Sequence, residues 1–260
     1  FFRNPGDLKD AGLEGSLQGK SIIIQGLGNV GYHAAKFLEE EDGAKIIAVI
    51  ERDGAIINKS GLPVEEVSAY KQENRKVEGF PNATFEPDGA KILTHPCDIL
   101  IPAAMEGVIT EENAPHLQCK VLAEAANGPV TYEADQILNQ RNIFIIPDAY
   151  LNAGGVTVSY FEWLKNLSHV KFGRMDRRFA EAQSQKIIEL MERALGKNLD
   201  QNAKEQLLEG PNEINLVRSG LDDTMRESYN EVREQHLNNP MINDRRTAAY
   251  ALSIRKIADI

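Results

Sequence analysis

The segment that decides the fold runs from residue 21 to residue 31 and reads Ser21-Ile22-Ile23-Ile24-Gln25-Gly26-Leu27-Gly28-Asn29-Val30-Gly31. Its first five residues are short, rich in β-branched side chains and bounded by glycine, which predicts a strand buried on both faces. Its last six residues fit the pattern G-x-G-x-x-G, and residues 29–41 have the composition of a helix. The pattern alone is weak, but its place between a strand and a helix indicates a dinucleotide-binding turn.

Each glycine of this turn has an expected role. Gly26 allows a sharp turn, Gly28 has no Cβ and lets a pyrophosphate approach the backbone, and Gly31 lets the helix pack close to the strand. The free amide groups and the dipole at the start of the helix would then hold phosphates without a basic side chain. The alternative is that the glycines only permit tight packing.

An acidic residue follows at the spacing that such a turn requires. Glu51 ends the next predicted strand, 20 residues after Gly31, and an acid at this place accepts hydrogen bonds from an adenosine ribose. A carboxylate there would repel a 2′-phosphate, so we expect NAD to be preferred, with NADP possible. Arg52, the next residue, could reduce that preference. The alternative is that Arg52 is only a solvated charge in a loop.

Short apolar runs recur along the first 150 residues. They predict strands at 45–50, 98–101, 120–123 and 142–146, and helices at 29–41, near Pro63, at 111–116 and at 132–139, whereas residues 74–96 show no clear pattern. Strands that alternate with helices favour a parallel sheet with helices on both faces. We therefore predict an α/β protein, with a doubly wound Rossmann-type parallel sheet in a dinucleotide-binding domain at residues 18–165.

The remainder of the chain has a helical pattern, which predicts a helical extension over residues 166–260 that packs on the sheet domain. Apolar residues share a helical face in three groups: Ile187, Ile188, Met191 and Leu195; Met225, Tyr229 and Val232; and Tyr250, Ile254 and Ile257.

Small and amide-bearing residues follow two of the predicted strands. Ala103 and Ala104 follow the strand at 98–101, and Asn127 follows the strand at 120–123. Ligands of open α/β sheets bind at the carboxyl ends of strands, where small residues allow close approach. Asn127 offers a donor and acceptors to a carboxamide or a ribose. The alternative for Asn127 is an ordinary Asn-Gly turn.

The run from Tyr150 to Trp163 joins a strand end to a helix. In it Asn152, Val156 and Ser159 stand at positions i, i+4 and i+7, which lie on one face of a helix. Two glycines at a helix start cost about 1 kcal/mol each against alanine, which suggests that a ligand or another backbone comes close. The alternative is tight packing of the helix on the sheet, with Ser159 bonded to its own helix.

Composition excludes several classes of function. The chain has 260 residues, with 29 Lys+Arg against 39 Asp+Glu and a net charge of −10, which argues against a nucleic-acid-binding surface. No apolar run approaches the roughly 20 residues of a membrane helix. Two cysteines, Cys97 and Cys119, cannot form a disulfide framework, which favours a reducing, cytoplasmic compartment; we expect them to be buried and inert. The five histidines are scattered, so we expect no metal site.

Several motifs together resemble glutamate dehydrogenase, in the family of glutamate, leucine, phenylalanine and valine dehydrogenases. The motifs are residues 25–31, 101–104, 123–129, 150–163, 218–221 and 246–250, and they span most of the chain. Leu27 and Ala125 depart from the commoner Phe and Gly, and neither change removes a hydrogen-bonding side chain.

The resemblance implies oxidative deamination of L-glutamate to 2-oxoglutarate and ammonia, with hydride transfer to the nicotinamide. It also implies that residues of this chain contact the dinucleotide, namely Gln25, Asn29, Val30, Glu51, Ala104, Asn127 and Asn152. Val156 and Ser159 match positions that contact the end of the substrate side chain. Members of the family are hexamers, so the resemblance implies a homohexamer for the full-length enzyme.

The catalytic lysine and aspartate of the family have no counterpart in this sequence. In the family they lie in an N-terminal substrate domain, whereas only 25 residues precede Gly26 here and the chain begins at Phe1 without Met. We therefore expect residues 1–17 to be the exit segment from an absent domain, and the chain to bind NAD without turnover. The alternatives are an amino-acid dehydrogenase of the leucine, phenylalanine or valine type, and a non-catalytic nucleotide-sensing module.

Overall fold

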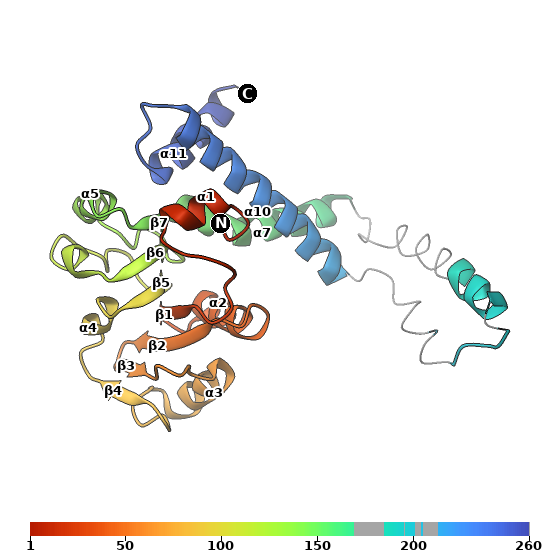
Figure 1. Cartoon of the computed structure of the whole chain (residues 1–260), viewed down its shortest axis with the longest axis horizontal. Coiled ribbons are helices and arrows are strands. Elements are labelled where there is room, and N and C mark those ends of the chain that lie inside the picture. Colours follow the sequence, from red (N-terminus) through yellow and green to blue (C-terminus); the bar gives the residue numbers. More distant parts are fainter. Residues whose placement is uncertain (169–184, 195, 201–203, 205–212, 260) are drawn as a thin grey trace. The chain divides into compact units, whose positions relative to one another are not determined.

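A computed structural model describes residues 1–168, 185–194, 196–200, 204 and 213–259 (Figure 1). The chain divides into two compact units, one made of Phe1–Asn152 and Tyr229–Ile260 and the other of Ala153–Ser228. The expected functional division at 17 and 165 stays a prediction. Within the described ranges, none of the helices combines the length and apolar character that a membrane crossing needs.

The first unit contains a seven-stranded sheet with the order β4-β3-β2-β1-β5-β6-β7. All five predicted strands are present, as β1 (Ser21–Gln25), β2 (Lys45–Glu51), β5 (Cys97–Pro102), β6 (Cys119–Ala123) and β7 (Phe144–Ile146). These five run parallel, so their carboxyl ends share one edge of the sheet. The chain moves outward from β1 to β2 and later returns to β5 on the other side of β1, which makes the β1–β5 boundary the switch point of a doubly wound sheet.

Two further strands at one edge pair antiparallel, so the sheet is mostly parallel. β3 (Gly54–Ile57) pairs with β2, and β4 (Thr84–Glu86) pairs with β3. Glu51 opposes Gly54, so Arg52 and Asp53 form the two-residue turn of a hairpin. Gly54 has φ of 140° and lies against the backbone of Glu86. Residues 51–54 therefore form a tight hairpin turn.

Helices cover both faces of the sheet, as Figure 1 shows. One face packs against α1 (Pro5–Asp10), α2 (Asn29–Glu40) and α3 (Val64–Asn74), and includes Ile22, Ile24 and Ala35 in its core. The other packs against α4 (Ala90–Leu93), the 3₁₀ turn η1 (Ala114–His116) and α5 (Tyr132–Gln140), and includes Ile23. The helix expected at 111–116 is reduced to this single 3₁₀ turn, which has Pro115 near its start.

The N-terminal residues are packed into the first unit, although their sequence shows no apolar period. Asp7 of α1 is only 1% exposed. Its carboxylate accepts hydrogen bonds from the Tyr229 hydroxyl at 2.7 Å, from Arg233 Nε at 3.1 Å and from Arg245 Nη2 at 3.1 Å. The Arg245 guanidinium also lies 3.7 Å from the ring centroid of Phe144 in β7. One buried charge thus ties α1 to the ends of α10 (Glu213–Asn238) and α11 (Arg245–Ala258).

α11 does not bury the apolar face that helical spacing identifies. Tyr250, Ile254 and Ile257 are more than half exposed, whereas the helix buries its small side chains Ala248 and Ala249 together with Leu252. Helical spacing identifies residues that share a face, but the packing partner decides which face is covered.

The second unit is helical, as expected. It contains α7 (Ala153–Ser168), a helix at residues 185–194 and the beginning of α10. Ile188 is buried and Ile187 and Met191 are exposed, while Leu195 lies outside the described residues.

The turn glycines allow a paired test of packing. A Cβ at Gly31 would overlap the carbonyl oxygen of Gly26, whereas a Cβ at Gly28 would meet nothing within 4 Å. We expect Gly31→Ala to lower the free energy of unfolding by about 3 kcal/mol, at the upper end of overpacking costs. The matched Gly28→Ala should cost about 1 kcal/mol or less, as a change at a helix N-cap. Urea denaturation followed by circular dichroism measures both, and equal losses would contradict the assigned packing role of Gly31.

The two cysteines allow a test of burial. Cys97 and Cys119 oppose each other on β5 and β6, and each is 7% exposed. Burial raises the pKa of the Cys97 thiol and raises the pKa of Cys119 to about 12. Because the thiolate is the reactive form, we expect no alkylation by iodoacetamide at pH 8 in the folded protein and full alkylation of both in urea. Mass spectrometry reads the outcome, and labelling of either thiol in the folded state would contradict it.

Candidate functional site

The turn after β1 brings the predicted glycines to the carboxyl edge of the sheet. Gly26 has φ of 88°, a left-handed conformation that glycine adopts readily. A Cβ there would lie 2.7 Å from the Cβ of Ala104, and Gly31 has no room for one either. Gly26 and Gly31 therefore let α2, β1 and the loop after β5 meet at close range.

Gly28 differs from its neighbours because nothing in the chain requires a glycine there. It is exposed, with ordinary φ of −79° and open space where a Cβ would stand. It is also the N-cap of α2, and no side chain caps that helix. The first amide groups of the helix thus have no partner inside it. A glycine cradle below an uncapped helix start is the geometry that holds a phosphate.

The residues beside this cradle add further polar groups. Asn29 and Val30, in the first turn of α2, are exposed, and Val30 is 55% exposed despite being apolar. Gln25, the last residue of β1, has a buried Oε1 without a hydrogen-bond partner among the described residues. Exposed apolar surface, free amides and an orphaned acceptor at one strand end fit a bound dinucleotide.

Glu51 lies at the end of β2 beside the turn, as the spacing predicts. Its Oε1 accepts a hydrogen bond from the Leu27 amide at 2.6 Å and from Lys71 Nζ at 2.5 Å. Its Oε2 accepts none from the described residues, so one carboxylate oxygen is available to a ribose. The side chain is 14% exposed, and Lys71 also donates to the Leu27 carbonyl at 3.2 Å.

Lys71 is a residue that the sequence reasoning missed. It belongs to α3 and has no spacing relation to the glycine motif, and its cation lies directly against the acid expected to select the cofactor. Arg52, in contrast, is exposed in the β2–β3 turn, and no hydrogen bond or ion pair of it occurs within the described part of the chain. The basic side chain that contacts Glu51 is therefore Lys71, and a role of Arg52 in cofactor choice stays a prediction.

The loops after β5 and β6 lie beside the turn. Ala103 and Ala104 contact Gly31 and Gly26, and Ala104 is exposed. The amides of Ala125 and Ala126 bond to the Pro102 carbonyl at 3.1 and 2.8 Å, which joins the β6 loop to the β5 loop. Asn127 is exposed at its tip. These residues form one continuous border along the carboxyl ends of β1, β5 and β6.

Asn152 belongs to the same border but not to the helix where it was expected. It is the C-cap of α6 (Asp148–Leu151), one residue before α7. Its Nδ2 donates to Asn127 Oδ1 at 2.7 Å and to the Ala126 carbonyl at 3.3 Å. Asn152 therefore orients the Asn127 side chain.

Val156 and Ser159 lie on α7 in the second unit. Both are exposed, Val156 at 73%. The Ser159 hydroxyl donates to the Gly155 carbonyl at 3.1 Å, which is the local bond of the alternative interpretation. A Cβ at Gly155 would meet nothing within 4 Å, so packing inside the described chain does not explain that glycine.

A buried ionic cluster lies next to the loop after β6; it consists of Arg246 and the carboxylates of Glu124, Asp135 and Asp148. Glu124 follows β6, is fully buried, and forms a two-bond ion pair with Arg246 of α11. Asp135 and Asp148 also contact the Arg246 guanidinium. Sequence reasoning missed these roles; the available signal was an acid at the end of an apolar strand run, which demands a buried partner.

The pKa values in this cluster follow its burial. Burial raises the pKa of Glu124, and the adjacent guanidinium opposes that shift. Burial works against the charged form of Arg246, but Glu124 and Asp135 outweigh it and raise the pKa of the guanidinium. Arg246 is thus held in its charged form by the acids around it. Within the described ranges, no group of three or more His, Cys, Asp or Glu residues is placed to hold a metal ion.

The chain is similar to a family of amino-acid dehydrogenases and to proteins described as glutamate dehydrogenases. A family model described as Glutamate/Leucine/Phenylalanine/Valine dehydrogenase matches residues 7–216. A probable glutamate dehydrogenase of Sinorhizobium fredii is 46% identical over 256 residues, covering 98% of this chain and 58% of that protein. The mitochondrial glutamate dehydrogenase of Dictyostelium discoideum is 49% identical over 250 residues, covering 96% and 49%. The chain spans about half the length of these relatives.

Solved structures agree in fold. The hetero-hexameric glutamate dehydrogenase of Thermus thermophilus, in a leucine-bound form, matches with a TM-score of 0.71 at 22% identity, covering 97% of this chain and 49% of that one. The glutamate dehydrogenase of Peptoniphilus asaccharolyticus matches with a TM-score of 0.63 at 27% identity, covering 97% and 48%.

Proposed function

The chain belongs to the glutamate/leucine/phenylalanine/valine dehydrogenase family, and we propose that it is the NAD-binding part of a glutamate dehydrogenase. The observation that carries the proposal is Gly28, an exposed glycine with open space at its Cβ, at the uncapped start of α2. The position of that turn at the switch point of the sheet supports it. The relatives of highest identity given above, both described as glutamate dehydrogenases, support glutamate as the substrate.

The proposed reaction is oxidative deamination of L-glutamate to 2-oxoglutarate and ammonia. Bound NAD supplies the hydride acceptor. In this chain, the first amides of α2 hold the pyrophosphate, and Glu51 Oε2 accepts from the adenosine ribose. Gln25, Ala104, Asn127 and Asn152 face the other half of the dinucleotide, and Val156 and Ser159 contact the far end of the substrate.

Residues outside this chain complete the proposed enzyme. The chain spans about half the length of its relatives, and it shows no glycine-rich segment that carries the family's lysine. We assign the catalytic lysine and aspartate, and much of a hexamer interface, to the other half, in a cytoplasmic enzyme. The chain by itself is then a cofactor-binding unit.

Two measurements on this 260-residue chain test the proposal. Isothermal titration calorimetry should show NAD binding that Gly28→Ala abolishes, because the added methyl group occupies the place of the pyrophosphate. A spectrophotometric assay should show no glutamate-dependent NAD reduction. Absence of NAD binding by a folded chain would overturn the assignment as a cofactor unit, and substantial turnover would overturn the assignment of the catalytic groups to the other half.

Substrate choice has its own test in an enzyme that contains both halves. Ser159→Ala should lower kcat/KM for glutamate by about tenfold or more, the loss expected for one hydrogen bond to a charged group, and should leave apolar amino acids largely unaffected. Steady-state kinetics with glutamate and leucine compares them. Equal losses would favour a leucine, phenylalanine or valine type of dehydrogenase.

The Glu51–Lys71 pair predicts how cofactor preference responds to charge. The wild-type chain should bind NAD more tightly than NADP, because Glu51 repels a 2′-phosphate. Glu51→Gln should reduce that ratio by about tenfold, or about 1.4 kcal/mol. The matched Lys71→Met should increase it, because the cation that offsets Glu51 is removed. Calorimetry with both dinucleotides measures the ratios, and equal or reversed affinities in the wild type would contradict the preference.

A further inference from the structure

We propose that Arg246 is a positioning residue that holds the Asn127–Gly128 loop in place for the nicotinamide half of the dinucleotide. The inference rests on the proposed function. Its basis is an unbroken series of hydrogen bonds that starts on α11 and ends at this loop.

The series begins with a pair of bonds between Arg246 and Glu124. Nη2 donates to Oε1 at 2.5 Å and Nη1 to Oε2 at 2.9 Å, a bidentate geometry that fixes both side chains. Arg246 Nη1 also donates to Asp148 Oδ1 at 3.3 Å. The backbone amide of Asp148 donates to Glu124 Oε2 at 2.9 Å, which closes a ring of three residues.

Asp148 connects this ring of hydrogen bonds to the Asn127–Gly128 loop. Its Oδ2 accepts a hydrogen bond from the Gly128 amide at 2.8 Å. The next residue toward β6 is Asn127, whose Oδ1 accepts from Asn152 at 2.7 Å. The Asn127 Nδ2 group makes no hydrogen bond within the described residues and is the group left to donate to a ligand. The loop is thus held from both ends, by Asp148 and by Asn152.

Charge explains why this position needs a guanidinium. Arg246 is the cation that contacts three carboxylates, those of Glu124, Asp135 and Asp148. Glu124 is fully buried and Arg246 is 20% exposed, so water screens these charges poorly. Without the cation, Glu124 and Asp148 repel each other, and Asp148 cannot stay at the distance that holds the Gly128 amide.

The topology assigns this loop to the nicotinamide half. Glu51 ends β2 on one side of β1, whereas the Asn127 loop follows β6 on the other side, beyond β5. A dinucleotide that lies across the switch point puts its two halves on opposite sides of it. With the adenosine at Glu51, the nicotinamide half lies at the β5 and β6 loops.

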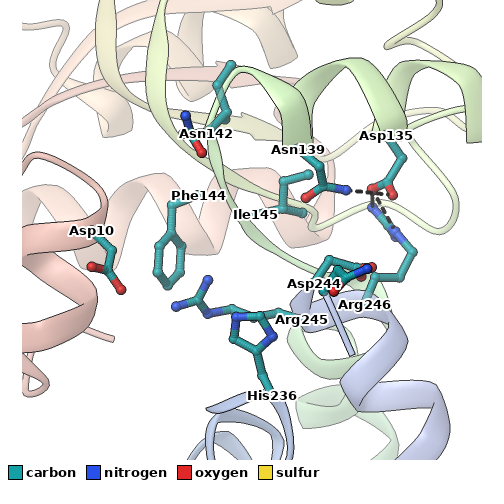
Figure 2. A pocket seen from close by; sticks show the side chains of 12 residues that line it. Asp10, Asp135, Asn139, Asn142, Phe144, Ile145, His236, Asp244, Arg245 and Arg246 are labelled. Atoms are coloured by element: carbon teal, nitrogen blue, oxygen red, sulfur yellow. Dashed lines mark hydrogen bonds and ion pairs between the residues drawn. The ribbon is translucent and has the colours of Figure 1, made fainter. Parts of the chain in front are cut away.

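The surroundings of Arg246 make substitutions there informative. Figure 2 shows its guanidinium reaching Asp135 at the wall of a polar cavity of about 190 Å³ that lies between α5, β7 and α11. The cavity has room for water near the cluster. A lysine at position 246 can therefore keep the charge, with water replacing the lost hydrogen bonds, without creating a dry void.

The test compares NAD with ADP, which lacks the nicotinamide half, on the full 260-residue chain. Arg246→Met should weaken NAD binding at least tenfold by calorimetry and leave ADP affinity within threefold. Arg246→Lys should recover part of the loss. Arg255→Met is the matched control, since Arg255 is an exposed arginine of the same helix, and it should change neither affinity.

Asp148→Ala is a second variant, which removes the bond to Gly128 and leaves the Arg246–Glu124 pair in place. It should show the same selective loss for NAD, even if Arg246→Met fails to fold by circular dichroism. Parallel losses for NAD and ADP, or unchanged NAD affinity in a folded variant, would overturn the positioning role. A wild-type chain that binds neither ligand would instead overturn the proposed function.

Discussion

The carbonyl oxygen of Gly26 occupies the place where a side chain at position 31 would have to stand. This close contact between the end of β1 and the first turn of α2 sets where the helix begins and where its free amides point. Ala103 and Ala104 pack against the same two glycines, so the loop after β5 is placed by the same contact. The other parts of the site are arranged around this point, which the chain maintains by omitting two Cβ atoms.

Electrostatics in this chain is local rather than global. A net charge of −10 does not prevent a phosphate site, because backbone amides at a helix start supply the positive potential. Two basic side chains near the site pair with acids of the protein: Lys71 contacts Glu51, and Arg246 contacts Glu124, Asp135 and Asp148. Both cations act on carboxylates of the protein rather than directly on an anionic ligand.

The sequence allowed the strands, their parallel core and the glycine turn to be predicted, because these depend on local pattern and on one spacing, from Gly31 to Glu51. The β3–β4 edge was missed because both strands are too short to show a periodic pattern: β3 has four residues and β4 only three. Lys71 and Arg246 were missed as contributors to the site because nothing local relates them to it. The Arg246–Glu124 contact joins residues 122 positions apart. The exposed face of α11 that contains Tyr250 has the same cause, because helical spacing shows which residues share a face but not which element packs against them.

The buried carboxylate of Asp7 also bears on how this chain is made. Its partners Tyr229, Arg233 and Arg245 lie 222 to 238 residues later. At a synthesis rate of about 5–20 residues per second, the ribosome needs roughly 12–48 s to supply the last of them. Until then Asp7 lacks the part of its counter-charge that Arg245 supplies. The first unit, which begins and ends with the two ends of the chain, therefore reaches its final packing only when translation of α11 has started, and a truncation before Arg245 leaves Asp7 without part of its counter-charge.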